Sequence, residues 1–258
     1  MDDILSFLSK KQNLKPLETV AQWKQLKSQF NIKEQGNETQ KEIIRYKKIE
    51  TCLEIVTHFI GKQDDTGRKL AIQSGIIRAI LDLFDKTPLN SISIVHTWAF
   101  FVFTFPTSDV VKTHILEKFT NVGLLDILEH SDLTIIHRIL IAINDILLAG
   151  TNCTPDAQPH PNFQVVNTVG GIQIMYNLFK KNLSEYSRDN SAFCIAQLYR
   201  AQSIPDPLMR SDVIGYLKSA INGVHEPMKI AATWALRFLA SNEINRTEIE
   251  KDGFKVPE

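Results

Sequence analysis

The sequence lacks several features that familiar functional classes require. Only three cysteines occur among 258 residues, an odd and small number that argues against a disulfide framework and favours a reducing compartment. Lys and Arg together number 29, as do Asp and Glu, so no excess of positive charge predicts a nucleic-acid or acidic-membrane partner. The longest apolar run, Trp98 to Phe103, is far shorter than the roughly 20 residues of a membrane-spanning helix. The start, MDDILSFLSKKQ, is unlike a secretory signal. We therefore expect a cytoplasmic or nuclear protein with no membrane insertion.

Motifs for catalysis and for cofactor binding are also missing. No Gly-rich phosphate loop, HExxH or CxxC occurs, and the seven histidines show no repeated ligand spacing. Cys52 and Cys194 fall in apolar segments, where a thiol packs as a small hydrophobe. Cys153 and His160 share the proline-rich loop 150–162, but one Cys and one His do not make a metal site. We expect no enzyme activity, no cofactor and no metal, and we keep this loop as an alternative binding site.

A period appears in the positions of four glycines. Gly75, Gly123, Gly171 and Gly253 are separated by 48, 48 and 82 residues, and the last interval is twice 41. This spacing fits repeats of about 40 residues with one glycine missing. We expect the first three to lie between two helices, where the chain requires a positive φ or a close approach of the backbone.

The same two-helix pattern follows Gly75, Gly123 and Gly171, and it recurs a fourth time from Ser211. A short amphipathic segment comes first, and a longer, strongly apolar one follows a polar gap. The short segments are GIIRAILDLFDK, GLLDILEH, GIQIMYNLFKK and SDVIGYLKSAI, and the long ones are SIVHTWAFFVF, IIHRILIAINDILL, RDNSAFCIAQLYRA and PMKIAATWALRFLA. Such units cannot bury their apolar faces alone, so neighbouring units must stack into an α-solenoid.

One long segment also has an alternative interpretation. SISIVHTWAFFVFTF is rich in β-branched and aromatic residues, which suit a buried strand. Its length and its place in the array favour a helix instead. We therefore predict an all-α protein.

The last complete unit resembles the armadillo repeat of importin-alpha and beta-catenin. Its third helix carries the pattern Ala231, Ala232, Trp234, Ala235, Leu236 and Leu239, and Asn245-Arg246 opens the next first helix. Gly170-Gly171 followed by IQIMYNLF resembles the glycine and second helix of the family. The resemblance implies a right-handed α-solenoid of armadillo/HEAT-like three-helix repeats over residues 41–258, with four to five units and the last incomplete. Residues 1–40 would form an amino-terminal helical cap and a polar linker. MDDILSFLSK and PLETVAQWKQLKSQF are expected to be the two helices of the cap, and NIKEQGNETQ the linker.

The resemblance also implies a binding groove. In the family, third helices line a continuous inner groove and present a Trp and, four residues on, an Asn to an extended peptide. The corresponding pairs here are Ile55 with Phe59, Trp98 with Val102, Ile141 with Asp145, Phe193 with Gln197, and Trp234 with Phe238. Only Gln197 keeps an amide, so this groove is more apolar than that of an importin. The same aromatic positions would instead belong to the core if the register differs by one residue.

These observations favour a scaffold or adaptor that binds another protein through the concave groove. The alternatives are an Hsp70-type chaperone cofactor of armadillo type, for which no residue is diagnostic, and a nuclear import adaptor, which the missing asparagines disfavour. The carboxyl-terminal end is a second candidate surface, because no further unit covers the helices of Tyr216, Leu217, Trp234 and Leu236. Either polar residues such as Lys218 cover it, or it recruits a second copy or a partner.

Overall fold

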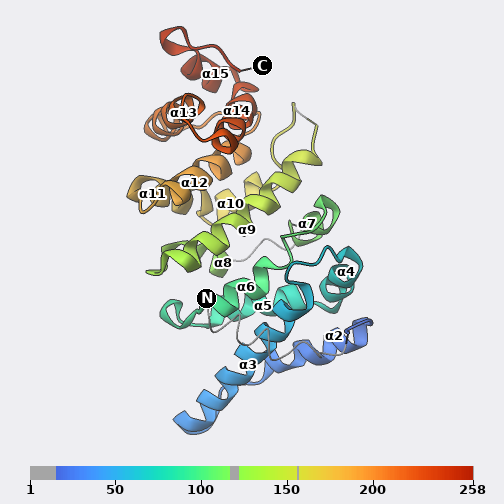
Figure 1. Ribbon diagram of the computed structural model, residues 1–258. Helices are drawn as coiled ribbons and strands as arrows, with labels where there is room; N and C mark the ends of the chain where they lie inside the picture. The colour runs from blue at the N-terminus through green and yellow to red at the C-terminus, as the bar shows by residue number, and fades with distance from the viewer. Residues whose placement is uncertain (1–15, 117–121, 156, 258) are drawn as a thin grey trace. The chain divides into compact units, whose positions relative to one another are not determined.

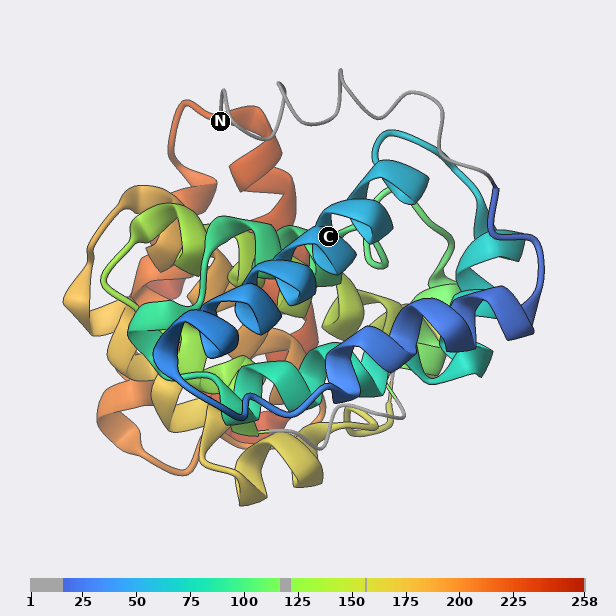
Figure 2. The same cartoon turned by 90° about the horizontal axis from the view of Figure 1, so that it is seen from below.

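The computed structural model describes residues 16–116, 122–155 and 157–257, and every regular element among them is a helix (Figure 1). Figure 2, turned by 90°, again shows only coiled ribbons. The chain divides into two compact units, residues 1–142 and 143–258, which we describe separately. The predicted all-α class is confirmed within the described residues.

The N-terminal unit is built from successive short helices. Its elements are α2 (Val20–Lys27), η1 (Ser28–Asn31), α3 (Glu38–Phe59), α4 (Asp65–Ser74), α5 (Ile76–Lys86), η2 (Leu89–Ser91), α6 (Ile94–Phe101), α7 (Asp109–Leu116), α8 (Val122–Asp126), η3 (Ile127–Glu129) and the first part of α9 (Leu133–Asn152). Helix α6 lies within the segment that also suited a strand, so the helical interpretation is confirmed. The triplets α4–α5–α6 and α7–α8–α9 are three-helix repeats that follow α3.

The C-terminal unit continues the same order. After the end of α9 come α10 (Phe163–Thr168), α11 (Gly171–Lys181), α12 (Glu185–Leu198), α13 (Pro207–Ile221), α14 (Glu226–Ala240), α15 (Glu243–Ile249) and η4 (Lys251–Gly253). Helices α11, α12, α13 and α14 pack in sequence, and the third helices α12 and α14 lie against each other (Figure 1). The third helices therefore form one face of this unit.

The amino-terminal segment partly matches its predicted organisation. The predicted helix over residues 1–10 lies outside the described residues, and the second is shorter than its pattern, spanning Val20–Lys27. The polar linker ends early, because the Asn37 side chain caps α3 and helix begins at Glu38. Trp23 on α2 is buried against the N-terminal unit, so this segment covers part of its core.

The glycine prediction holds in part. Gly75 joins α4 to α5 with φ 83°, the left-handed conformation that favours glycine. Gly123 lies inside α8, where a Cβ would stand 2.7 Å from the backbone nitrogen of Asp85, so it provides close approach rather than a positive φ. The prediction of a positive φ at Gly171 is wrong. The neighbouring Gly170 has φ 74°, and α11 begins at Gly171.

Two buried arginines bind the carboxyl ends of third helices. In the N-terminal unit, Arg68 Nε donates to the carbonyl oxygen of Val102 at 2.8 Å, and its Nη2 donates to that of Phe59 at 3.3 Å. In the C-terminal unit, Arg200 donates to the carbonyl oxygens of Thr151 at 2.6 Å and Thr154 at 2.9 Å. The last carbonyls of a helix have no intrahelical partner and carry partial negative charge. In each unit, a guanidinium therefore satisfies carbonyl oxygens at the carboxyl end of a third helix.

Helix α9 is the one helix among the described residues that is long and apolar enough to cross a membrane. In the folded chain 56% of its most apolar stretch is buried, as in the core helix of a folded domain. The buried part of this helix packs within the fold.

Candidate functional site

A pocket of about 560 Å³ opens on the third-helix face of the C-terminal unit. Helices α9, α12 and α14 supply its walls. Its apolar lining comes from Leu148, Phe193, Ala231, Trp234, Ala235 and Phe238, and its polar lining from Asn144, Thr151, Asn152, Thr154 and Gln197. We call this the third-helix pocket. It contains no charged side chain in its lining, so it suits an uncharged occupant.

The aromatic wall of this pocket is exposed where a ligand would meet it. Trp234 is 51% exposed, and its ring stacks with that of Phe238 at a centroid distance of 6.3 Å. The guanidinium of Arg237 lies 4.8 Å from the Trp234 ring centroid, and that of Arg200 lies 5.7 Å from the Phe238 centroid. The two aromatic rings are thus oriented by cations of the same unit and remain available for apolar contact.

A chain of side-chain amides runs from α12 to α9 and back beside the aromatic wall. Asn190 Nδ2 donates to the carbonyl oxygen of Tyr186 at 2.9 Å, and Asn144 Nδ2 donates to Asn190 Oδ1 at 3.4 Å. Gln197 Nε2 then donates to Asn144 Oδ1 at 2.6 Å. Both Asn144 and Gln197 line the pocket. The chain fixes their orientation, which preorganises the polar side of the site.

Arg200 and His160 form hydrogen bonds to backbone carbonyls at the end of α9 that borders the pocket. Arg200 binds the carbonyls of Thr151 and Thr154, whose residues line the pocket. His160 Nε2 lies 2.9 Å from the carbonyl oxygen of Leu147, and burial lowers the pKa of His160 to about 4. A neutral imidazole can donate to that carbonyl through Nε2 while its Nδ1 accepts from the backbone N–H of Asn162. The loop 150–162 thus contributes support to this site.

Four of the ten residues predicted for the groove meet in this pocket. They are Phe193, Gln197, Trp234 and Phe238. Ile141 and Asp145 are half-buried and do not line it. On α9 the lining positions are Asn144, Leu148, Thr151 and Asn152, so the register there is one residue away from the predicted one. The signal was in the sequence, because Asn144 and Leu148 are four residues apart and share one helix face.

The predicted groove positions of the N-terminal unit are corrected by the structure. Ile55, Phe59 and Val102 are buried and offer no accessible groove surface. Phe59 stacks on Trp23 at 5.3 Å between ring centroids. Trp98 is half-buried, and the guanidinium of Arg138 lies 3.8 Å from its ring centroid. These third-helix aromatics are used in packing within their own unit.

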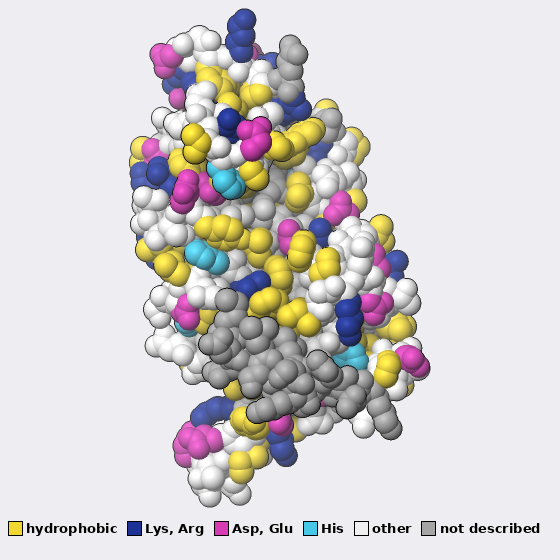
Figure 3. All heavy atoms as spheres, in the orientation of Figure 1, with side chains coloured by type: hydrophobic (Ala, Val, Ile, Leu, Met, Phe, Trp, Pro, Cys, Tyr) yellow, Lys and Arg dark blue, Asp and Glu magenta, His cyan; other side chains and the backbone are white. Residues whose placement is uncertain are grey.

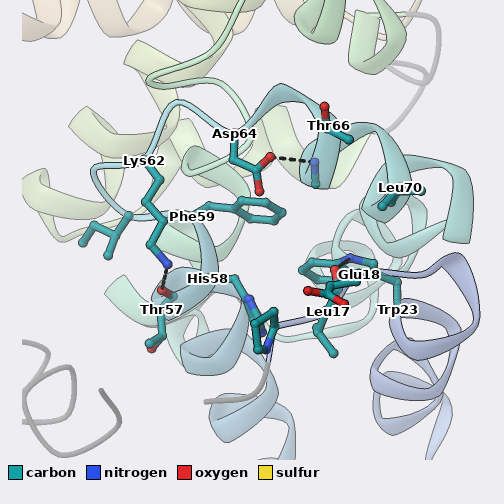
Figure 4. A pocket seen from close by; sticks show the side chains of 13 residues that line it. Leu17, Glu18, Trp23, Thr57, His58, Phe59, Lys62, Asp64, Thr66 and Leu70 are labelled. Carbon is teal, nitrogen blue, oxygen red and sulfur yellow. Dashed lines mark hydrogen bonds between the residues drawn. The ribbon is translucent and has the colours of Figure 1, made fainter. Parts of the chain in front are cut away.

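A second pocket, of about 630 Å³, lies in the N-terminal unit (Figure 4). Trp23, His58 and Phe59 form its aromatic side, and Glu18, Lys62 and Asp64 bring charges of both signs. Asp64 Oδ1 is occupied as the cap of α4, since it accepts from the backbone N–H of Gly67 at 2.8 Å. Burial lowers the pKa of His58. This mixed lining does not define one ligand chemistry, so we do not assign it a function.

The described residues contain no cluster of metal-binding side chains. No group of three His, Cys, Asp or Glu side chains within 16–116, 122–155 and 157–257 is placed to hold a metal ion. Burial raises the pKa of Cys52 and Cys194 far above that of a free thiol, which makes each a packed side chain rather than a nucleophile. On the face drawn in Figure 3, Lys and Arg are interspersed with Asp and Glu.

The carboxyl-terminal end is better covered than the sequence indicated. Leu217 and Leu236 are buried, so the prediction of an uncovered apolar face is wrong for these two residues. Lys218 Nζ donates to the carbonyl oxygen of Lys251 at 3.1 Å and lies 4.8 Å from the Phe254 ring centroid. Helix α15 and residues 251–257 pack on α13 and α14 at this end. Self-association through this end stays a prediction.

The fold is similar to that of solved armadillo repeat proteins. A designed armadillo repeat protein in complex with the peptide (KR)4 matches with TM-score 0.57 and 15% identity, over 90% of this chain and 87% of that chain. A computationally designed armadillo repeat protein for modular peptide recognition matches with TM-score 0.51 and 14% identity, over 91% and 97%. An engineered protein from a structural genomics consortium matches with TM-score 0.53 and 12% identity, over 94% and 100%. No protein-family model and no curated protein matches the chain.

These likenesses identify the fold as an armadillo-like α-solenoid. At such low identity they show the architecture and leave the function to be argued from the pocket. Solenoids of this class are typically protein- and peptide-binding scaffolds.

Proposed function

We propose that this protein is a non-enzymatic scaffold or adaptor that binds a segment of a partner protein in the third-helix pocket. The observation that carries the proposal is the half-exposed Trp234 beside a neutral pocket of about 560 Å³. Exposed aromatic side chains at a concave site are typical anchors of protein recognition. The peptide named with one of the similar structures supports the same use of the fold.

We also propose that the third-helix pocket catalyses no reaction. The pocket lining contains no acid, base or thiol side chain, and catalysis of acyl, phosphoryl or glycosyl transfer requires such groups in reach of the substrate.

We propose a cytoplasmic or nuclear location on the cysteine content and charge balance of the sequence.

Affinity purification with quantitative mass spectrometry tests this function. The wild type is compared with a Phe193→Ala, Trp234→Ala double variant and with Leu208→Ala, which truncates a 60% exposed side chain outside the pocket. We expect a defined set of proteins to be retained by the wild type and Leu208→Ala and lost by the double variant at unchanged melting temperature. Retention of the same set by the double variant would contradict the proposal.

A further inference from the structure

A basic pocket of about 280 Å³ lies in the N-terminal unit, where α3 and α5 both pack against α6 (Figure 1). Its charged lining is Arg45 and Lys48 of α3, Lys86 of α5, and Glu34, which precedes α3. The Glu34 carboxylate accepts from Arg45 Nε at 2.9 Å and from Lys48 Nζ at 2.8 Å. One carboxylate therefore faces three cations, and the lining has an excess of two positive charges. We call this the α3–α5 pocket.

The carboxylates that pair with these cations outside the lining do not cancel this excess, because each is shared with a further cation. The ion pairs are Glu38–Arg45 at 2.8 Å, Glu38–Lys41 at 3.5 Å, Asp82–Arg78 at 2.8 Å and Asp82–Lys86 at 3.7 Å. The network as a whole keeps two more positive than negative charges. A phosphorylated side chain, with a charge of about −1.5 to −2, would neutralise it.

A neutral N–H donor also lines the α3–α5 pocket. His96 is 5% exposed, and its Nδ1 lies 3.0 Å from the backbone nitrogen of Ser93. That backbone N–H can only donate, so Nδ1 accepts and Nε2 carries the ring proton. Burial lowers the pKa of His96 to about 4, which keeps the imidazole neutral. Nε2 makes no hydrogen bond with any described residue, so it is left as a donor for an anion.

Thr87 places a hydroxyl at this pocket. It follows the last residue of α5, lines the pocket and is half-buried. Its backbone N–H donates to the carbonyl oxygen of Leu83 at 3.0 Å, whereas its hydroxyl makes no hydrogen bond with any described residue. The exposed Pro88 disfavours the α conformation at Thr87, which is extended at φ −95° and ψ 127°. An extended segment with a free hydroxyl and a following proline is the kind of substrate that proline-directed protein kinases accept.

The chain contains one other Thr-Pro pair, Thr154-Pro155, and its hydroxyl is engaged. Thr154 Oγ1 donates to the carbonyl oxygen of Gly150 at 2.8 Å. The carbonyl oxygen of Thr154 accepts from Arg200 Nη2 at 2.9 Å. Both bonds hold this segment against the rest of its unit. The sequence therefore offers two similar acceptors, and the fold leaves the hydroxyl of Thr87 free.

We propose that Thr87 is a phosphorylation site for a proline-directed protein kinase and that the α3–α5 pocket receives the resulting phosphate. In this reaction Thr87 Oγ1 attacks the γ-phosphorus of a nucleoside triphosphate, the bond from that phosphorus to the β,γ-bridging oxygen breaks, and the hydroxyl proton passes to the catalytic aspartate of the kinase. The phosphate then accepts from Lys48, Lys86 and His96 Nε2, and it joins the end of α5 to α3. The inference goes beyond the proposed function and does not involve the third-helix pocket.

Two groups oppose a phosphate at this position. The last carbonyls of α5 carry about half an elementary negative charge, which is smaller than the excess of two positive charges in the network. Glu34 is the second group. It is bonded to both Arg45 and Lys48, so a phosphate that takes over Lys48 leaves Glu34 paired with Arg45. The balance of charge therefore favours the phosphate.

Phosphorylation of the full-length protein with ATP and a proline-directed serine/threonine kinase tests the acceptor. The kinase is chosen because it modifies synthetic peptides of residues 82–93 and 149–160, which contain the two Thr-Pro pairs. In the folded protein, mass spectrometry should show modification of Thr87 at least about tenfold faster than that of Thr154, because Thr154 must first lose its hydrogen bond to Gly150. Thr87→Val should remove the principal site. Equal rates at the two threonines, or no modification of Thr87, would overturn the proposal.

Phosphorus-31 NMR across a pH titration then locates the phosphate. Neighbouring cations favour the dianion, so the second pKa of phosphorylated Thr87 should lie at least about half a unit below its usual value of about 6. Lys48→Met and Lys86→Met should each raise this pKa toward its usual value. Lys47→Met is the matched control, because Lys47 is exposed and does not line the pocket, and it should leave the pKa unchanged.

The pKa of the phosphate decides whether the pocket receives it. A wild-type value at or above about 6, or the same value in the wild type and both lining variants, would overturn the proposal. Lys86 is 77% exposed, so Lys86→Met keeps the test decisive if Lys48→Met fails to fold. No partner protein enters either experiment, so the result is independent of whether the proposed function holds.

Discussion

The third helices of the two units carry similar side chains and use them in opposite ways. In the C-terminal unit, Phe193, Trp234 and Phe238 border the third-helix pocket and Trp234 is half-exposed, whereas in the N-terminal unit Phe59 and Val102 are each only 1% exposed. Helical spacing alone assigns all of these positions to one face. The difference shows that the same sequence pattern produces a core in one unit and a surface in the other.

The cause lies in what packs against each face. In the N-terminal unit Trp23 covers Phe59 and the guanidinium of Arg138 covers Trp98. In the C-terminal unit the arginine beside Trp234 is Arg237, three residues later on the same helix. Its position leaves the indole half-exposed. Contacts between residues far apart in the sequence therefore cover the third-helix aromatics of the N-terminal unit. In the C-terminal unit the contact is within one helix and leaves Trp234 accessible.

The largest expected effect contrasts the packed face with the open one. Phe59→Ala should lower the free energy of unfolding by about 3 to 5 kcal/mol, because it removes a buried ring that stacks on Trp23 and meets Phe103 edge-on. Phe193→Ala, at a half-buried ring on the pocket wall, should lower it by about 1 kcal/mol or less. Urea denaturation followed by circular dichroism measures both. Equal losses would mean that the two faces are packed alike.

Substitution of the two buried arginines should distinguish an effect on stability from an effect on binding. Arg200→Ala and Arg68→Ala should each destabilise by about 2 to 4 kcal/mol, because each leaves two carbonyl oxygens without a buried donor. Only Arg200→Ala should also weaken binding at the third-helix pocket, since it holds the backbone of Thr151 and Thr154 there. Thermal melting and, below the melting temperature, titration with a partner protein identified by affinity purification provide the two readouts. Weakened binding by Arg68→Ala at a temperature where it is folded would contradict the assignment.

Acid sensitivity should be common to both units. Burial lowers the pKa of His96 and of His160 to about 4, below the value of about 6.5 for an unfolded chain. Each imidazole is neutral in the fold, so the unfolded chain binds more protons and stability is lost as pH falls from about 6.5 toward 4, with no effect above that range. Between pH 7 and pH 5 we expect a loss of about 1 to 2 kcal/mol for each histidine.

Urea denaturation at the two pH values measures this loss in the wild type and in His160→Gln. The variant should lose the part that arises from His160 and retain the part that arises from His96. An unchanged pH dependence in the variant would show that His160 does not titrate as its burial implies.

The smallest expected effect concerns the neighbouring glycines before and within α11. Gly170→Ala should destabilise by about 1 kcal/mol, because φ 74° strains any residue with a Cβ. Gly171→Ala should have a smaller effect, since Gly171 is already helical and alanine has the higher helix propensity. Melting temperatures of the two variants decide the order. A larger loss for Gly171→Ala would restore the sequence-based assignment.

Much of the fold could be predicted from local signals. The glycine period and the alternation of short and long apolar segments gave the helix order, because each is set within one repeat. The pairs Phe193 with Gln197 and Trp234 with Phe238 were placed correctly on a common face, since their helices are regular and strongly patterned.

Other features depend on contacts that no local pattern contains. The burial of Phe59 requires Trp23, which lies 36 positions earlier in the sequence. The register of α9 shifted by one residue because an apolar helix offers several similar faces, and Asn144 is distinguished only by its amide partners on α12. The orientation of the Gln197 amide likewise follows from three residues joined across two helices. Such networks are visible only in the folded chain.

Two tryptophans provide the most direct test of the contrast between the units. Trp98 and Trp234 occupy corresponding positions on third helices, one covered by Arg138 and one bordering the third-helix pocket. The measurement is the affinity of a partner protein, identified by the affinity purification described above, for Trp98→Ala and for Trp234→Ala, each at a temperature where it is folded. The account predicts at least about a tenfold loss for Trp234→Ala and wild-type affinity for Trp98→Ala. Full affinity of Trp234→Ala, or an equal loss in both variants, would contradict it.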